Sequence, residues 1–188
     1  MPLFEWERDL FVFLHGLNSE SLNPLMIFVS SFIPWLPITF FLLYYVFKAQ
    51  SKRNFFVILS YLVLLLAMSD SSTSYFFKNL FGRLRPCHME ELKEFIIEFG
   101  QRCGGKNGFF SSHASNSFAL GAFLLNFGII PRSYKIMTWS FLILIAYSRI
   151  YLGVHLPLDV IMGAIWGIFL SKLWIFLTKN SLKELVGA

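Results

Sequence analysis

Charged residues are scarce in this sequence, at 14% of 188 residues, and there are only two cysteines. A soluble domain usually has about 25% charged residues and about 45–50% apolar ones. This chain is 56% hydrophobic and 19% aromatic, which excludes a disordered chain, a coiled coil and a collagen-like chain. The formal net charge of +5 does not indicate a nucleic-acid-binding module, because Lys and Arg gather in short clusters between apolar runs. That pattern is typical of an integral membrane protein.

Five apolar stretches approach the roughly 20 residues that a helix needs to cross a bilayer core about 30 Å thick. They cover residues 22–47, 55–77, 112–130, 134–150 and 156–177. Prolines in the first stretch predict a kink near residues 33–37. Residues 1–21 contain acidic and apolar groups at helical spacing, which predicts an amphipathic helix on the membrane surface. We therefore predict an all-α, polytopic membrane helix bundle: one domain over residues 1–188, with about five transmembrane helices and one interfacial helix.

Basic residues mark three connecting segments, namely residues 48–53, the turn with Arg132 and Lys135, and the C-terminal tail. By the positive-inside rule these segments face the cytoplasm. The loop over residues 82–110 then faces outward. We predict a multi-pass protein of a bacterial-type inner (plasma) membrane, with its active site on the periplasmic side and its C-terminus in the cytoplasm. An outward loop lies in an oxidising compartment, where disulfides persist.

Cys87 and Cys103 both lie in this outer loop, so we predict that they form a disulfide. They lack the paired spacing of a zinc site, and no metal is expected.

The predicted topology brings a restricted set of polar residues to the outer membrane face. They are Lys78, Arg85, Ser111, Ser112, His113, Arg149, His155 and Asp159. Three cations suit a dianionic phosphate, and unpaired backbone N–H groups at a helix start form an anion site. Two histidines can divide nucleophile and acid roles. His155 and Asp159 are four residues apart, so on a helix they share a face.

The spacing of these residues resembles the three motifs of the type 2 phosphatidic acid phosphatase (PAP2) superfamily. Lys78, six further residues, Arg85 and Pro86 fit the first motif. The segment from residue 110 to residue 113 resembles the second, Pro-Ser-Gly-His, with Phe in place of Pro and Ser in place of Gly. Residues 148–159, which begin with Ser-Arg and end at Asp159, fit the third.

The resemblance implies a metal-independent phosphatase without a cofactor. It implies that His155 attacks phosphorus to form a phosphohistidine, that Asp159 orients this histidine, and that His113 protonates the leaving group. It also implies a set of phosphate-binding residues: Lys78, Arg85, Ser111, Ser112 and Arg149. The serine in place of glycine changes how closely the backbone of residue 112 reaches the phosphate.

Asp70 lies in a serine-rich stretch, residues 69–74, inside a predicted span. It shares a helix face with Ser74 and Lys78 and lies about 12 Å deeper than Lys78, at 1.5 Å per residue. Ionisable residues at such depth usually face a protein interior and have partners. We expect Asp70 to give structural hydrogen-bond support beneath the site, in preference to a contact with substrate.

Together these features predict an integral membrane lipid phosphatase that acts on a lipid phosphate monoester or diphosphate. Prenyl diphosphate, phosphatidylglycerol phosphate, phosphatidate and lipid A phosphate all remain open as substrates. The alternatives are a lipid-to-lipid phosphotransferase with the same site, and a lipid-binding or transport protein without turnover. The expected partners are the lipid substrate and the bilayer; neither nucleic acid nor an obligatory protein partner is expected.

Overall fold

The structure, a computed structural model, describes residues 3–96 and 103–180 and is built from helices. The longer helices are α1 (Glu5–Gly16), α2 (Asn23–Ser30), α3 (Trp35–Ala49), α4 (Lys52–Ser71), α6 (Ser112–Leu125), α7 (Arg132–Tyr151) and α8 (Pro157–Leu177). A π-helical turn, Ser72–Phe77, joins α4 to the short α5 (Lys78–Phe81), and two 3₁₀ turns, Pro86–His88 and Glu90–Leu92, follow. Apart from one isolated bridge between Leu84 and Asn107, the described residues contain no strand. The predicted all-α class is confirmed.

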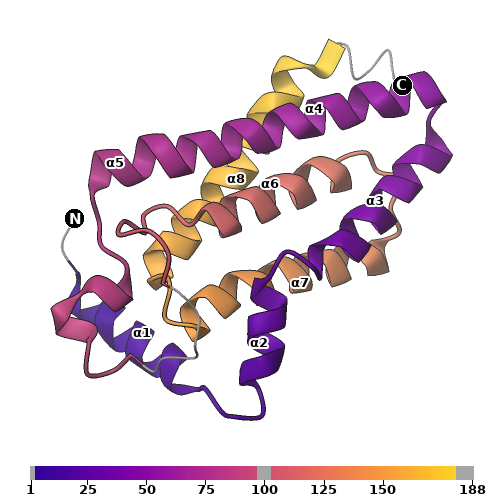
Figure 1. Cartoon of the computed structure of the whole chain (residues 1–188). Helices are drawn as coiled ribbons and strands as arrows, with labels where there is room; N and C mark the ends of the chain where they lie inside the picture. Colours follow the sequence, from indigo (N-terminus) through magenta and orange to yellow (C-terminus); the bar gives the residue numbers. More distant parts are fainter. Residues whose placement is uncertain (1–2, 97–102, 181–188) are drawn as a thin grey trace.

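Helix α6 is the centre of the bundle, with α8 against it and α4 alongside (Figure 1). Ten of its fourteen residues are buried. The backbones of α6 and α8 are in close contact. A Cβ added at Gly163 would lie 2.5 Å from the Ser111 carbonyl oxygen. At Gly167 it would lie 2.1 Å from the Ser115 carbonyl oxygen. The two glycines therefore bring the first turn of α6 against the second and third turns of α8.

Two helical segments, Lys52–Phe81 and Pro157–Asn180, are long and apolar enough to cross a bilayer. Helices α2 and α3 give a third if they form one span, bent by 48° at residues 31–34. This bend confirms the predicted kink. Helix α6 has 14 residues and is only about 21 Å long at 1.5 Å per residue, and α7 carries three basic residues. The predicted total of five spans therefore stays a prediction.

Helix α1 packs against α7 and α8 through a buried face formed by Glu7, Phe11 and His15. The His15 Nδ1 atom lies 2.8 Å from the Tyr151 carbonyl oxygen, and its ring stacks on Phe11. Trp6 and Phe13 are exposed on the other side. The sequence predicted an amphipathic helix here, but its acidic Glu7 lies on the buried face. The interfacial location of this helix stays a prediction.

The predicted outer loop, residues 82–110, leaves the end of α5 and returns to the start of α6 (Figure 1). Residues 97–102 of this loop, like residues 1–2 of the predicted interfacial segment and Lys183 of the tail, lie outside the described residues. The loop's two ends are joined by the Cys87–Cys103 disulfide, with Cα atoms 6.3 Å apart. The disulfide predicted from the sequence is therefore present.

Candidate active site

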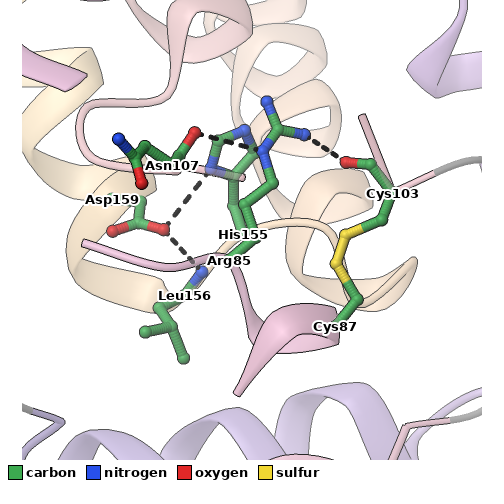
Figure 2. Close-up of a disulfide and its surroundings, with 7 residues drawn as sticks. All are labelled: Arg85, Cys87, Cys103, Asn107, His155, Leu156 and Asp159. Carbon is green, nitrogen blue, oxygen red and sulfur yellow. Dashed lines mark hydrogen bonds and ion pairs between the residues drawn. A yellow bond between two sulfur atoms is a disulfide. The ribbon is translucent and has the colours of Figure 1, made fainter. Parts of the chain in front are cut away.

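His155 and Asp159 form a buried pair at the start of α8, as Figure 2 shows. Leu156 caps the helix, and Asp159 Oδ2 accepts its backbone N–H at 3.0 Å, which is the reciprocal half of a capping box. The same oxygen lies 3.4 Å from His155 Nδ1. A carboxylate that holds Nδ1–H leaves Nε2 unprotonated, with a lone pair available for chemistry.

The other carboxylate oxygen of Asp159 accepts a hydrogen bond from Arg83, a residue that was not predicted to belong to the site. Arg83 NH1 donates to Asp159 Oδ1 at 3.0 Å and to Glu7 Oε1 at 3.1 Å, and NH2 donates to Glu7 Oε2. Glu7 Oε1 also accepts the Leu158 N–H at 3.0 Å. The three charged side chains are fully buried. Helix α1 thus closes the back of the site and fixes Asp159 from a second direction.

The first turn of α6 is tied to α8 by Ser111 and to the π-helical turn by Ser112. The Ser111 N–H donates to the Asp159 carbonyl oxygen at 2.9 Å, and its hydroxyl caps α6 by accepting the Ala114 N–H. Lys78 Nζ donates to Ser112 Oγ at 2.8 Å. The hydroxyls of Thr73 and Ser74 lie 3.0 and 3.1 Å from the same oxygen. The serine that departs from the family motif therefore holds the lysine of the first motif.

Arg149 lies at the end of α7 and is buried. Its NH1 donates to Ser30 Oγ of α2, while its carbonyl oxygen accepts the His155 N–H at 3.2 Å. Its Nε atom is buried and has no hydrogen-bond partner within the described part of the chain. Arg149 therefore retains an N–H group that can donate a hydrogen bond to a bound oxyanion.

Arg85 is anchored by the loop that contains the disulfide (Figure 2). Its NH1 donates to the Cys103 carbonyl oxygen at 2.5 Å, and its Nε donates to the Asn107 carbonyl oxygen at 3.4 Å. Gly108 lies between the site residues: a Cβ there would lie 2.9 Å from Asp159 Oδ2 and 3.1 Å from Arg85 Cγ. Glycine is therefore required where this loop crosses the His155–Asp159 pair.

A cavity of about 580 Å³ leads to this group of residues. Five predicted residues line it: Lys78, Arg85, Ser112 and His113 of the phosphate site, and Asp70, which was expected beneath that site. Most of the remaining lining is apolar and comes from Phe32, Trp35, Leu36, Phe40, Leu66 and Leu120. Ser111, Arg149, His155 and Asp159 are buried and do not line the cavity. The structure therefore brings all eight predicted residues of the phosphate site together and separates them into a cavity-facing set and a buried set.

Burial and the surrounding cations control the charge of His155. Desolvation lowers the pKa of His155 well below its ordinary value, and the positive charges of Arg85, Arg149 and Lys78 lower it further. Burial likewise lowers the pKa of Arg85, whereas the Asp159 carboxylate opposes this change. His155 is thus a neutral imidazole in the free protein, the form that a nucleophile requires.

Among the described residues, one group has ligand atoms close enough to share a metal ion: Cys87, His88 and Cys103, within 4.8 Å of one another. The two sulfur atoms of this group are joined in the disulfide. The thiolate form that binds metal is therefore not available in this state.

The bundle and the cluster of cations, histidines and carboxylates at one end define an integral membrane protein suited to binding a phosphate group. Residues 55–183, more than half of the chain, match the family model of the PAP2 superfamily, and all three motifs lie within this range. The chain belongs to the PAP2 superfamily.

Curated relatives and a solved structure agree with this assignment. The chain is 31% identical over 179 residues to lipid A 4'-phosphatase of Porphyromonas gingivalis, covering 93% of this chain and 75% of the relative. It is 34% identical over 183 residues to lipid A 4'-phosphatase of Bacteroides thetaiotaomicron, covering 95% and 79%. The crystal structure of a transmembrane PAP2-type phosphatidylglycerolphosphate phosphatase from Bacillus subtilis has the same fold, with a TM-score of 0.70 at 18% identity, covering 93% of this chain and 85% of that chain.

Proposed function

We propose that this protein is a membrane lipid phosphatase that hydrolyses a phosphate monoester of a lipid A-type lipid, with a phosphohistidine intermediate at His155. The observation that carries the proposal is the His155–Asp159 pair, whose carboxylate is fixed by both Leu156 and Arg83. The two relatives named lipid A 4'-phosphatase support the substrate class. A protein that only bound lipid would not need a neutral histidine held by a buried carboxylate.

In the first step the phosphate lies among Lys78, Arg85 and Arg149. His155 Nε2 attacks phosphorus as the bond to the lipid oxygen breaks. His113, which lines the cavity and takes up a proton when the phosphate dianion binds, donates that proton to the leaving oxygen as the imidazolium. Negative charge on the equatorial oxygens is stabilised by the three cations and by the backbone N–H groups at the start of α6.

In the second step a water molecule attacks the phosphohistidine and His113 accepts its proton. The nitrogen–phosphorus bond breaks, inorganic phosphate leaves, and His155 returns to its neutral form. Asp159 keeps its hydrogen bond to Nδ1 in both steps and offsets the positive charge that develops on the imidazole ring.

The apolar part of the cavity is suited to the lipid side of the substrate. Its aromatic and aliphatic lining comes mainly from the α2–α3 bend and α3, with Leu66 on α4 and Leu120 on α6. A lipid tail can move from the bilayer into this lining without exposing apolar surface to water. A phosphate at one end and a tail in the cavity fit a lipid phosphate better than a water-soluble phosphate ester.

The site is proposed to face the periplasmic side of a bacterial inner membrane, with the C-terminus in the cytoplasm. The α3–α4 and α6–α7 connections lie at the end of the bundle opposite the disulfide loop (Figure 1). Both connections are basic, which supports a cytoplasmic location for that end. The disulfide supports an oxidising location for the other end.

The test is release of inorganic phosphate from purified protein in detergent, with lipid A 4'-phosphate, undecaprenyl diphosphate, phosphatidylglycerol phosphate and phosphatidate as substrates. We expect release to be fastest from the lipid A phosphate, to be insensitive to EDTA and to be absent in His155→Ala. Phosphate that appears only on an added acceptor lipid would instead indicate the phosphotransferase. Loss of activity in EDTA with recovery on addition of a divalent metal would contradict the histidine mechanism.

A further inference from the structure

Asp70 and Asn116 form a polar pair on the wall of the cavity, and the proposed mechanism uses neither residue. Asn116 Nδ2 donates to Asp70 Oδ1 at 3.0 Å, and both residues line the cavity. Asp70 lies within the apolar span Lys52–Phe81, yet its side chain is exposed to the cavity.

The orientation of the Asn116 amide is fixed by the residues behind it. Ser69, which is buried, donates to Asn116 Oδ1 at 2.7 Å and is hydrogen-bonded to Ser115 Oγ at 2.7 Å. With its oxygen occupied, Asn116 must present its NH₂ group to Asp70. The pair is thus a preorganised acceptor, in which Asn116 holds the carboxylate against the cavity wall.

One amide hydrogen bond leaves most of the carboxylate's acceptor capacity unused. An ionised carboxylate offers about four lone-pair sites, and the Asn116 contact takes one of them. Carboxylates in membrane spans face cavities or pathways and have partners there. Within the described part of the chain no second hydrogen bond to the Asp70 carboxylate is seen, and Asp70 lines the cavity in which the lipid is proposed to lie.

We propose that the Asp70–Asn116 pair binds an uncharged N–H or O–H donor of the lipid substrate, such as an amide or a hydroxyl next to its acyl chains. This inference rests on the proposed function. It gives Asp70 a contact with substrate in place of the structural role expected from the sequence. The pair selects lipids that carry such donors over lipids whose tails offer only esters or hydrocarbon, because those leave the carboxylate unpaired.

The distance between the two polar groups agrees with a donor close to the phosphate. The Lys78 ammonium bends back to Ser112, and Ser112 lies four residues, one helical turn, before Asn116 on α6. Ser112, which binds Lys78, and Asn116, which binds Asp70, are therefore separated by a rise of about 6 Å along α6, at 1.5 Å per residue. Lys78, Ser112, Asp70 and Asn116 all line the same cavity, so a lipid whose phosphate contacts Lys78 can offer a nearby donor to the pair.

The test compares two lipids of matched tail length in mixed micelles. Ceramide 1-phosphate carries an amide N–H and a hydroxyl near its phosphate, whereas phosphatidate carries two esters and neither donor. Release of phosphate gives kcat/KM for each lipid, and the ratio of the two values measures selection for the donor. We expect wild type to prefer ceramide 1-phosphate and Asp70→Leu to lower the ratio by about 10- to 100-fold, the loss of a hydrogen bond to a charged group.

Two further variants make the comparison decisive. Asp70→Asn keeps an acceptor oxygen without the charge and is expected to lower the ratio about 3-fold, since charge-assisted bonds are roughly twice as strong as neutral ones. It also tests the proposal if Asp70→Leu does not fold. Ser60→Leu is the matched control, because Ser60 lies on the same helix and its hydroxyl donates to the Phe56 carbonyl oxygen of that helix. This variant should keep the wild-type ratio.

An unchanged ratio in both Asp70 variants would overturn the proposal, and so would an equal loss for both lipids, which indicates a purely structural role. Turnover of phosphatidate without turnover of ceramide 1-phosphate would also overturn it, while leaving the proposed phosphatase function intact. Wild-type protein that hydrolyses neither these lipids nor lipid A 4'-phosphate would overturn the proposed function itself.

Discussion

Arg83 and Asp159 form a fully buried ion pair, with 3.0 Å between NH1 and Oδ1. Glu7 completes the set from α1, so one arginine lies between two carboxylates from opposite ends of the sequence. The pair links the N-terminal helix directly to the carboxylate that holds His155. A helix that could be only a membrane anchor is thus a structural part of the site.

Glu7→Leu is expected to destabilise the protein by about 1–3 kcal/mol, because the buried Arg83 NH2 group and the Leu158 N–H lose their acceptor while Arg83 keeps Asp159. Phosphatase activity should fall as well, since Asp159 loses one of its fixed contacts. The unfolding temperature in detergent measures the first effect. Glu5→Leu, an exposed position on the same helix, is the control and should be close to wild type. Equal unfolding temperatures and equal activities of the two variants would show that the Glu7–Arg83 contact contributes neither to stability nor to activity.

Gly108→Ala should lower kcat by about 100-fold, since misplacement of reacting groups by about 1 Å lowers the rate by that factor. Little loss of stability is expected. The new methyl group would lie 2.9 Å from Asp159 Oδ2 and must displace either the carboxylate or the loop. Gly105→Ala is the matched control, because a Cβ there meets nothing within 4 Å. If Gly108→Ala kept full activity, the loop would not lie over the pair as described.

Removal of the disulfide should both destabilise the protein and weaken substrate binding. The bond closes a segment with a sequence separation of 16, and a loop of that size is worth about 3 kcal/mol in the chain-entropy model. It also holds Cys103, whose carbonyl oxygen accepts from Arg85. We expect the Cys87→Ser, Cys103→Ser double variant to unfold at lower temperature and to show a raised KM.

Mass spectrometry of alkylated, unreduced protein checks the bond itself. Protein recovered from an oxidising compartment should contain no alkylated cysteine. Two alkylated thiols would contradict the disulfide and also the outward orientation of the loop.

Stability should decrease as the pH falls below about 6.5, the ordinary pKa of histidine. Burial and the neighbouring cations lower the pKa of His155 in the folded protein. Between that lowered pKa and about 6.5 the unfolded chain binds more protons, so acid favours unfolding. Burial also lowers the pKa of His15, which adds to the effect with the same sign.

Unfolding temperatures at pH 5 and pH 8 test this dependence. The difference between the two temperatures should be smaller in His155→Gln and in His15→Gln than in wild type. A difference that is unchanged in both variants would mean that neither histidine is held neutral by the fold.

The sequence predicted the features that follow from local spacing and from the order of apolar stretches along the chain. The four-residue interval between His155 and Asp159 needs only one helical turn to bring them together. The assignment of Lys78, His113 and Arg149 to one end follows from counting apolar stretches. The bend between α2 and α3 follows from its prolines.

The sequence did not predict the features that depend on packing between distant segments. Arg83 lies two residues before Arg85 in the same motif, but its side chain goes to the back of the site because Glu7 and Asp159 are there. Glu7 is 76 residues away from Arg83, on a helix whose acidic residues suggested a solvent-facing surface. Nothing in the local pattern distinguishes a buried glutamate from an exposed one on such a helix.

The most direct test of the central claim is to trap the phosphoenzyme. Protein is mixed with lipid A labelled with ³²P at the 4'-phosphate, quenched within milliseconds in alkali, digested and analysed by tandem mass spectrometry. A phosphoramidate is stable in alkali and labile in acid, so the account predicts an acid-labile label on the peptide that contains His155. No label should appear in His155→Gln. Rapid turnover with no label, or label on a residue other than His155, would contradict the mechanism.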